Sequence, residues 1–363
     1  MGSFTPPTVA PPLKPLGIIG SLRAMRENAL NIIPDIAYTQ PIVTGKTGFS
    51  RWHMVQGPEA LKHIFLDNVE NYPKSEVVIR MLRPAIGESL FTSEGSNWRW
   101  QRRAISPVFT ARNVTALAPL MTKTAERAAT RIANKQNGEC EMTHEMSCEM
   151  VREMLSATFD VICEVALSGR EHFDSEKYAE AVTKYFLTVG RASLLDFLET
   201  PYWVPRPGEI RGRHAVKTMH KMVQEAIDAR KNDMANLNKN SDDLLDYMMK
   251  AEDAQTGRKM APKDLLHNMQ FFIVAGHETT ALTLAWALYL LANDQEAQER
   301  ARKEATSILG RGDQAKAASA EDIAKAPYIE QVLQETMRLY PPVGFLARKA
   351  IKPDQLYDRE IRS

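Results

Sequence analysis

The sequence predicts a mainly α-helical protein with a small β region. A long apolar stretch, Pro262–Ala292, contains no further proline, and most other segments show helical periodicity. Strand-favouring residues are confined to two short regions. With 363 residues, 44% hydrophobic and 25% charged, the chain can bury one large core or two smaller ones. We expect one domain over 1–363, with a small sheet in 1–56, a helical body in 57–342 and an interrupted strand region in 343–363.

Charge and cysteine content exclude several classes of function. Forty-six Lys and Arg against 45 Asp and Glu give a net charge of +1, so no bulk attraction to nucleic acid or anionic membrane is expected. The three cysteines, Cys140, Cys148 and Cys163, form no CxxC pair with a matching histidine set. We therefore expect free thiols in a reducing compartment, with neither a disulfide framework nor a cysteine-based metal site.

The first residues of the chain carry no recognisable targeting signal. Apolar pieces such as Leu16–Ile19 are too short to span a bilayer, and no basic region precedes an apolar run with a cleavage site. These observations predict a soluble, cytoplasmic protein. Residues Pro41–Gln56 suit strands with turn points at Gly45 and Gly48, and Gly57-Pro58-Glu59 then opens a helix over Ala60–Phe65.

Helices are predicted for most of the remaining chain. The expected segments are Asn113–Lys135, Thr143–Leu167, Tyr178–Val189, Ile210–Asn232, a short helix capped by Ser241 that ends at Met249, Gln295–Leu309 and Ala324–Leu339. Polar loops are expected over Lys231–Asp242 and Gly310–Ala320. Residues Ala350–Ser363 look like the start of a strand pair.

The stretch Pro262–Ala292 predicts one helix of about 30 residues and roughly 45 Å, long enough to cross a whole domain. Its flanks are apolar nearly all round, which marks a buried helix. A membrane span is the rival interpretation. However, Gly276, His277, Glu278, Thr279 and Thr280 lie at the midpoint, where an ionisable side chain in lipid would cost on the order of 3 kcal/mol. We therefore predict a core helix and no membrane span.

This polar midpoint carries the main functional signal. Thr279 and Thr280 can donate to the carbonyls of Ala275 and Gly276, which would bend the helix and open a polar pocket. The block from Ala275 to Thr280 resembles the oxygen-activating motif of cytochrome P450 monooxygenases. The resemblance implies that the groove beside Ala275 and Gly276 receives dioxygen, that Thr279 holds it, and that Glu278 relays protons. The alternative is a kinked core helix with a satisfied polar cluster.

A second motif contains Trp98 and Arg102. Four residues apart on a helix, they share a face and present an indole donor and a guanidinium, which suits an anionic planar ligand. The spacing, with Pro107 and Phe109 after it, resembles the P450 helix whose Trp and Arg bind a haem propionate. A lone WxxxR pattern is also compatible with surface packing or cation–π stacking.

A third motif is Glu335 with Arg338, one helical turn apart and followed by the helix stop Tyr340-Pro341-Pro342. The ExxR pattern occurs twice elsewhere in the chain, so the stop and the position after the central helix single out this copy. It resembles the family's ExxR helix, whose pair is buried and is joined by a further arginine. Arg348 falls where the family often has a second propionate partner.

The resemblance also implies a substrate pocket. Segments Tyr178–Val189, Asp196–Pro207 and Ile210–Asn232 resemble the two helices and the connecting loop that roof this pocket in cytochromes P450. Candidate substrate-facing residues, each equally compatible with a core role, are Leu187, Leu194, Leu195 and Phe197.

The resemblance runs from about Gly17 to the last residue and implies haem as the cofactor. The family's proximal ligand is a cysteine in a glycine-rich loop after ExxR, whose thiolate favours cleavage of the oxygen–oxygen bond. No cysteine follows Cys163, and none of the three cysteines suits that role. We therefore expect a chain truncated before the cysteine loop.

Three hypotheses follow. The first is a bacterial, soluble-type P450 that hydroxylates a small apolar substrate with dioxygen and electrons from a ferredoxin-type donor. The second is a truncated, inactive form of such an enzyme. The third is a helical binding protein without redox chemistry.

Overall fold

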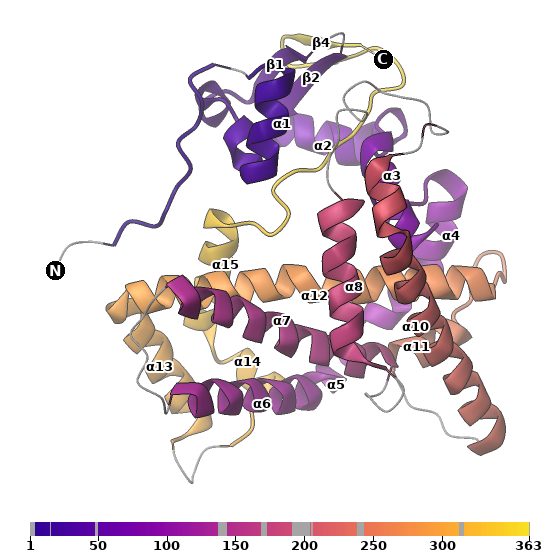
Figure 1. The fold of residues 1–363 in the computed structure, drawn as a ribbon, viewed down its shortest axis with the longest axis vertical. Helices are drawn as coiled ribbons and strands as arrows, with labels where there is room; N and C mark the ends of the chain where they lie inside the picture. Colours follow the sequence, from indigo (N-terminus) through magenta and orange to yellow (C-terminus); the bar gives the residue numbers. More distant parts are fainter. Residues whose placement is uncertain are drawn as a thin grey trace.

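The computed structural model describes residues 4–14, 16–47, 50–136, 144–167, 173–190, 204, 206–237, 243–311 and 316–362. It confirms the predicted mainly α-helical class with a small β region (Figure 1). The α-helices are α1 Ile18–Glu27, α2 Pro58–Lys62, α3 Glu76–Ile86, α4 Gly95–Ile105, α5 Ala111–Ala116, α6 Ala118–Gln136, α7 His144–Leu167, α8 Ser175–Thr188, α10 Pro207–Leu237, α11 Leu244–Lys250, α12 Pro262–Asn293, α13 Gln295–Leu309, α14 Ala320–Ile323 and α15 Pro327–Leu339. The strands are β1 Ile42–Thr47, β2 Ser50–Val55, β3 Asp354–Leu356 and β4 Arg359–Ile361.

Strands β1 and β2 lie where strands were predicted and pair as an antiparallel hairpin, but Gly45 is not a turn point. It lies within β1 directly opposite Trp52 of β2. A Cβ atom at this position would come within 2.0 Å of the indole ring, so glycine here makes room for the ring. The other expected turn residue, Gly48, lies outside the described residues.

The C-terminal segment packs against the region around β1, β2 and α2, at the end of the molecule opposite α6 (Figure 1). One carboxylate oxygen of Asp354 in β3 accepts hydrogen bonds from Tyr72 at 2.7 Å and from Asn68 at 2.9 Å, and lies 2.9 Å from the His63 ring. The strand pair expected near the end of the chain is present and is tied to residues almost 300 positions earlier.

Helix α12 crosses the middle of the helical body and packs most extensively along α7, with α10 and α15 also against it (Figure 1). The main apolar core lies between α7, α8, α10 and α12. A polar residue of α12 is satisfied inside this core. Buried Gln270 accepts a hydrogen bond from Tyr178 at 2.5 Å and donates one to the carbonyl of Met219 at 2.7 Å.

Some predicted boundaries were wrong. Helix α10 continues to Leu237, through residues where a loop was expected to begin at Lys231. Helix α11 is capped by Asp243, whose carboxylate accepts from the backbone N–H of Asp246 at 2.8 Å. The expected cap, Ser241, lies outside the described residues. Helices α1, α3 and α14 formed where none was predicted.

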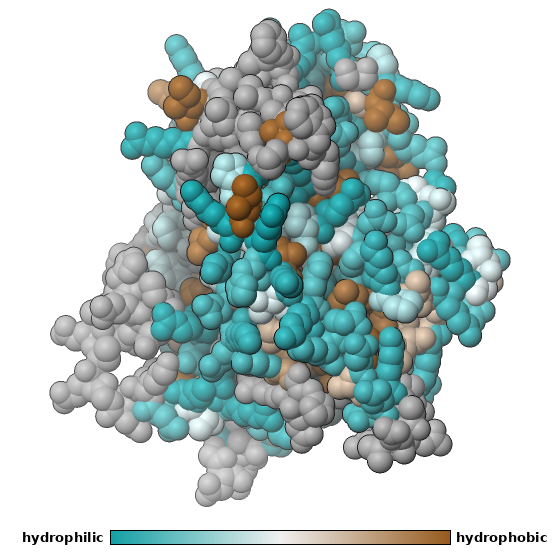
Figure 2. Space-filling view, turned by 45° about the vertical axis from the view of Figure 1, so that its right-hand side comes forward, coloured by the Kyte–Doolittle hydropathy of each residue, from teal (hydrophilic) through white to brown (hydrophobic). Residues whose placement is uncertain are grey.

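Among the described helices, α12 is the one long and apolar enough to cross a membrane by length and composition. In the fold it packs among α7, α10 and α15. The face of the molecule drawn in Figure 2 is largely hydrophilic, with apolar residues scattered over it in small groups.

Candidate functional site

Of the two hydrogen bonds predicted at the polar midpoint of α12, the structure shows the one from Thr279 to Ala275. The Thr279 hydroxyl donates to the carbonyl of Ala275 at 2.9 Å, as expected from its position one turn later. Thr280 is exposed, and in the described part of the chain its hydroxyl makes no corresponding bond to Gly276. Helix α12 continues as an α-helix through all of these residues.

Gly276 allows a close approach between α12 and α7. A Cβ atom at this position would lie 2.9 Å from Cδ1 of Ile162, so the space on this side of α12 is filled by α7. The next residue, His277, is buried, and its ring packs edge-to-face on Phe159 with 4.9 Å between ring centroids. The predicted oxygen groove can therefore lie on the side of Ala275 and Thr279, one turn apart on another face of the helix.

Glu278 is half-buried, and burial raises the pKa of its carboxyl. No hydrogen bond or ion pair involves this side chain within the described ranges. A carboxyl of this kind can hold a proton closer to neutral pH than an exposed glutamate can.

Helix α4 presents Trp98 and Arg102 at the surface, with 37% of Trp98 exposed. Two neighbouring arginines, Arg99 and Arg103, each bind a carboxylate at 2.7 Å. Arg102 pairs with no carboxylate among the described residues. The cation–π contact of this helix involves Trp100, which lies under Arg258, and not Trp98.

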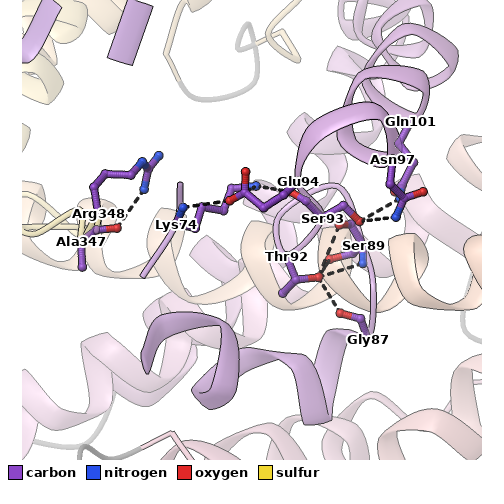
Figure 3. Close-up of polar contacts among 10 residues, drawn as sticks. All are labelled: Lys74, Gly87, Ser89, Thr92, Ser93, Glu94, Asn97, Gln101, Ala347 and Arg348. Atoms are coloured by element: carbon purple, nitrogen blue, oxygen red, sulfur yellow. Dashed lines mark hydrogen bonds and ion pairs between the residues drawn. The ribbon is translucent and has the colours of Figure 1, made fainter. Parts of the chain in front are cut away.

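Arg348 lies on the C-terminal segment beside Lys74, with which it forms an isolated antiparallel bridge. Its guanidinium donates to the carbonyl of Ala347 at 3.0 Å (Figure 3). The guanidinium also lies 4.9 Å from the ring of Phe65. Burial lowers its pKa. No carboxylate of the described chain lies within ion-pair distance of Arg348, so this cation, like Arg102, is available to an anion.

Glu335 and Arg338 form the predicted pair on α15, with two hydrogen bonds at 2.7 and 2.6 Å. The resemblance implied a buried pair, but the side chains are 54% and 66% exposed. The reason is that no described segment packs over this side of α15. The hydrogen bonds from Arg338 lower the pKa of the Glu335 carboxyl.

The predicted substrate-facing residues are only partly described. Leu187 is 54% exposed at the end of α8, and Leu194, Leu195 and Phe197 lie outside the described residues. Sequence reasoning missed a row of aromatic rings beside the site. Phe271 of α12 lies 5.8 Å from Phe91 and 4.9 Å from Phe272, which lies 5.1 Å from Phe109. The signal was present, because Phe271 precedes Ala275 by one helical turn.

The residues fit one side of a haem group. Arg102 and Arg348 offer positive charge to carboxylates, Trp98 offers an indole N–H, and Ala275 with Thr279 forms a small polar site on α12. The proximal side does not fit. Cys163 is fully buried in the apolar core, which raises the pKa of its thiol and keeps it protonated.

The structure shows no other cysteine side chain that could serve as the proximal ligand among the described residues. Cys140 and the side chain of Cys148 lie outside the described residues, and the 363 residues contain no later cysteine.

Comparison with known proteins decides the family. The sequence model of the family described as Cytochrome P450 matches residues 9–363. The chain belongs to the cytochrome P450 family. Membership implies haem as the cofactor.

Curated relatives are eukaryotic P450s. Human cytochrome P450 4V2 is 26% identical over 302 residues, covering 78% of this chain and 55% of the human protein. Ganoderic acid synthetase CYP5150L8 of Ganoderma lucidum is 26% identical over 328 residues, covering 81% and 58%. Pig cytochrome P450 4A24 is 28% identical over 314 residues, covering 83% and 59%. The chain thus spans little more than half the length of these relatives.

Solved structures show the same fold. The crystal structure of the cytochrome P450DA heme domain has a TM-score of 0.75 and 19% identity, covering 97% of this chain and 75% of that one. The crystal structure of the cytochrome P450 CYP102L1 has a TM-score of 0.70 and 22% identity, covering 93% and 72%.

Two sequence predictions are corrected by these relatives. The bacterial, soluble type is not supported, because the curated relatives named above come from human, fungus and pig. The cytoplasmic location is contradicted, because the matched members of the cytochrome P450 4 group are membrane-bound.

Proposed function

We propose that this chain forms the oxygen-side half and the carboxylate-binding edge of a P450 haem site, which serves hydroxylation of a small apolar substrate by dioxygen. The observation that supports this most is the middle of α12. Thr279 bonded back to Ala275, beside the half-buried Glu278, lies at the centre of a helix that crosses the domain. We also propose that all 363 residues belong to one domain.

The propionate edge would be held by Trp98 and Arg102 of α4 and by Arg348. The indole N–H and two guanidinium groups are donors suited to the two carboxylates of haem. This is supported by the absence of a carboxylate partner for Arg102 and for Arg348 among the described residues. Arg99 and Arg103, which lie on α4 with Arg102, are each paired with a carboxylate.

When bound, haem supplies the redox-active iron at which dioxygen is activated. The chain itself handles protons and water. The half-buried Glu278 carboxyl, whose pKa is raised by burial, would take up a proton and pass it on more readily than an exposed glutamate. The Thr279 hydroxyl can turn from the carbonyl of Ala275 toward a ligand beside the helix. The aromatic row at Phe91 and Phe271 would give an apolar substrate a surface to pack against.

Electrons would come from a redox donor, which membership of the cytochrome P450 family implies. We propose a one-electron donor in general terms. Neither the ferredoxin type expected from the sequence nor the identity of the substrate has support from the relatives beyond the family level.

Titration with haemin tests the proposal. We expect 1:1 binding, followed as quenching of tryptophan fluorescence, and weaker binding in Arg102→Ala and Arg348→Ala. The reduced complex with carbon monoxide should lack a thiolate-type absorption shift, because Cys163 is buried and protonated. Absence of haemin binding, or equal affinity in both variants and the parent chain, would overturn the proposal.

A further inference from the structure

Two fully buried amides join the helix of the oxygen site to the helix of the propionate site. Asn268 of α12 and Gln101 of α4 are both 0% exposed. The Asn268 side chain donates from Nδ2 to Oε1 of Gln101 at 2.9 Å. Its Oδ1 accepts from the backbone N–H of Leu90, in the loop before α4, at 2.8 Å. One asparagine therefore binds both α4 and the loop that leads into it.

The hydrogen bonds continue from Gln101 toward Arg348. Nε2 of Gln101 donates to the Ser93 hydroxyl at 3.0 Å, and the Ser93 carbonyl accepts from the Lys74 ammonium at 2.6 Å. Lys74 is the bridge partner of Arg348. Figure 3 shows the contacts of Ser93 with Gln101 and with Lys74, and Arg348 on the neighbouring C-terminal segment.

The positions of the two amides relate them to the proposed site. On α12, Asn268, Phe272, Ala275 and Thr279 follow the i, i+4, i+7, i+11 spacing that places residues on one face of a helix. On α4, Gln101 lies between Trp98 and Arg102 in sequence. The contact between Asn268 and Gln101 therefore fixes the position of α4 along α12 and its rotation about its own axis. This sets where Trp98 and Arg102 lie relative to Ala275 and Thr279.

Both amides use their nitrogen and their oxygen in hydrogen bonds, which makes the alignment specific. Nδ2 of Asn268 donates a second time, to the carbonyl of Asp264 at 2.9 Å, and Nε2 of Gln101 also donates to the carbonyl of Glu88 at 3.4 Å. Each amide thus makes three hydrogen bonds. Sliding or turning α4 by one residue would leave several buried polar groups unpaired, and each is costly at 0% exposure.

We propose that Asn268 and Gln101 are positioning residues that set the register between the oxygen side and the propionate side of the haem site. The proposal rests on the proposed haem function. It assigns to these amides a role that packing alone would not require, because an apolar pair could fill the same space without fixing a register.

Gln270 provides a matched control. It is also 0% exposed on α12, and its side chain makes two hydrogen bonds, to Tyr178 of α8 and to Met219 of α10. Asn268→Leu and Gln270→Leu each replace one buried amide of the same helix with the same apolar side chain. Both substitutions should reduce the stability of the fold. A difference between the two variants in ligand affinity or hydrogen exchange therefore reports the specific connection to α4.

The test uses iron-free protoporphyrin IX, whose two carboxylates probe the site without any axial ligand. We expect Asn268→Leu to raise the Kd for protoporphyrin about tenfold or more, because misplaced donors lose charge-assisted hydrogen bonds. Gln270→Leu should change it less than about twofold. Gln101→Leu should match Asn268→Leu, and the double variant should add little further.

Hydrogen exchange of the ligand-free protein separates this proposal from the proposed function. Asn268→Leu should speed the exchange of backbone amides in residues 90–105, and Gln270→Leu should not. If the parent chain binds no protoporphyrin but this difference is seen, the haem function fails and the register connection stands. Equal effects of Asn268→Leu and Gln270→Leu on exchange and on Kd would overturn the register proposal.

Discussion

Gly276→Ala tests why a glycine lies in the middle of helix α12. Helix propensity alone favours alanine by about 1 kcal/mol. Against this, the new methyl group would lie 2.9 Å from Cδ1 and 3.2 Å from Cγ1 of Ile162 in α7. Overpacking of this kind costs about 1 to 3 kcal/mol. The contact outweighs the propensity, so we expect Gly276→Ala to reduce the free energy of unfolding by about 0 to 2 kcal/mol.

A second substitution shows whether Ile162 is the cause. Ile162→Val removes Cδ1, the nearest atom, and alone costs about 0.5 to 1.5 kcal/mol. In the double variant the alanine methyl occupies the freed space. The loss of unfolding free energy in the double variant should therefore be clearly smaller than the sum of the losses in the two single variants. Urea unfolding followed by far-ultraviolet circular dichroism measures all four proteins. An increase in stability in Gly276→Ala, or strictly additive losses, would refute the assignment of this glycine to close helix packing.

Three further predictions concern the site. Arg102→Ala should weaken haemin binding about tenfold, whereas Arg99→Ala, which removes an arginine already paired with Glu70, should leave it within about twofold; fluorescence titration compares them. Thr279→Ala, in a haem-loaded protein joined to a proximal cysteine segment, should lower product formed per electron consumed, and an unchanged ratio would remove Thr279 from the proposed role. Burial lowers the pKa of His277 from 6.5 to about 4, so the unfolded chain binds the extra proton between these values. About 3 kcal/mol of stability should then be lost as the pH falls from 6.5 to 4, and urea midpoints should show a smaller loss in His277→Leu.

Much of the fold followed from local patterns. The period of apolar residues and the positions of prolines predicted α7, α12, α13 and α15 closely, because these helices are long and their ends are marked. The bond from Thr279 to Ala275 was predictable for the same reason, since it depends on residues one turn apart. Motifs whose members are neighbours on one helix, such as Trp98 with Arg102, are accessible to sequence reasoning.

Features that depend on distant residues were not predictable. Glycine is common in turns, so the local sequence at Gly45 predicts a turn, and only the pairing with Trp52 shows that this glycine makes room for a ring. The exposure of Glu335 and Arg338 depends on which segments cover α15. Asn268 and Gln101 are 167 positions apart, and nothing in either local sequence indicates that the two amides meet.

The pairing of the arginines on α4 distinguishes structural cations from those available to a ligand. Arg103 binds Asp253 through two hydrogen bonds at 2.7 Å, which attaches α4 to the loop before α12 from the outer side. Gln101 attaches the same helix to Asn268 from the inner side. With both sides of α4 fixed to α12 and its preceding loop, the backbone of Arg102 is held in place, and among the described residues no carboxylate pairs with its exposed guanidinium. An arginine on a fixed helix without an internal partner is suited to bind the carboxylate of a ligand, which is the physical basis for assigning Arg102 to the propionate edge.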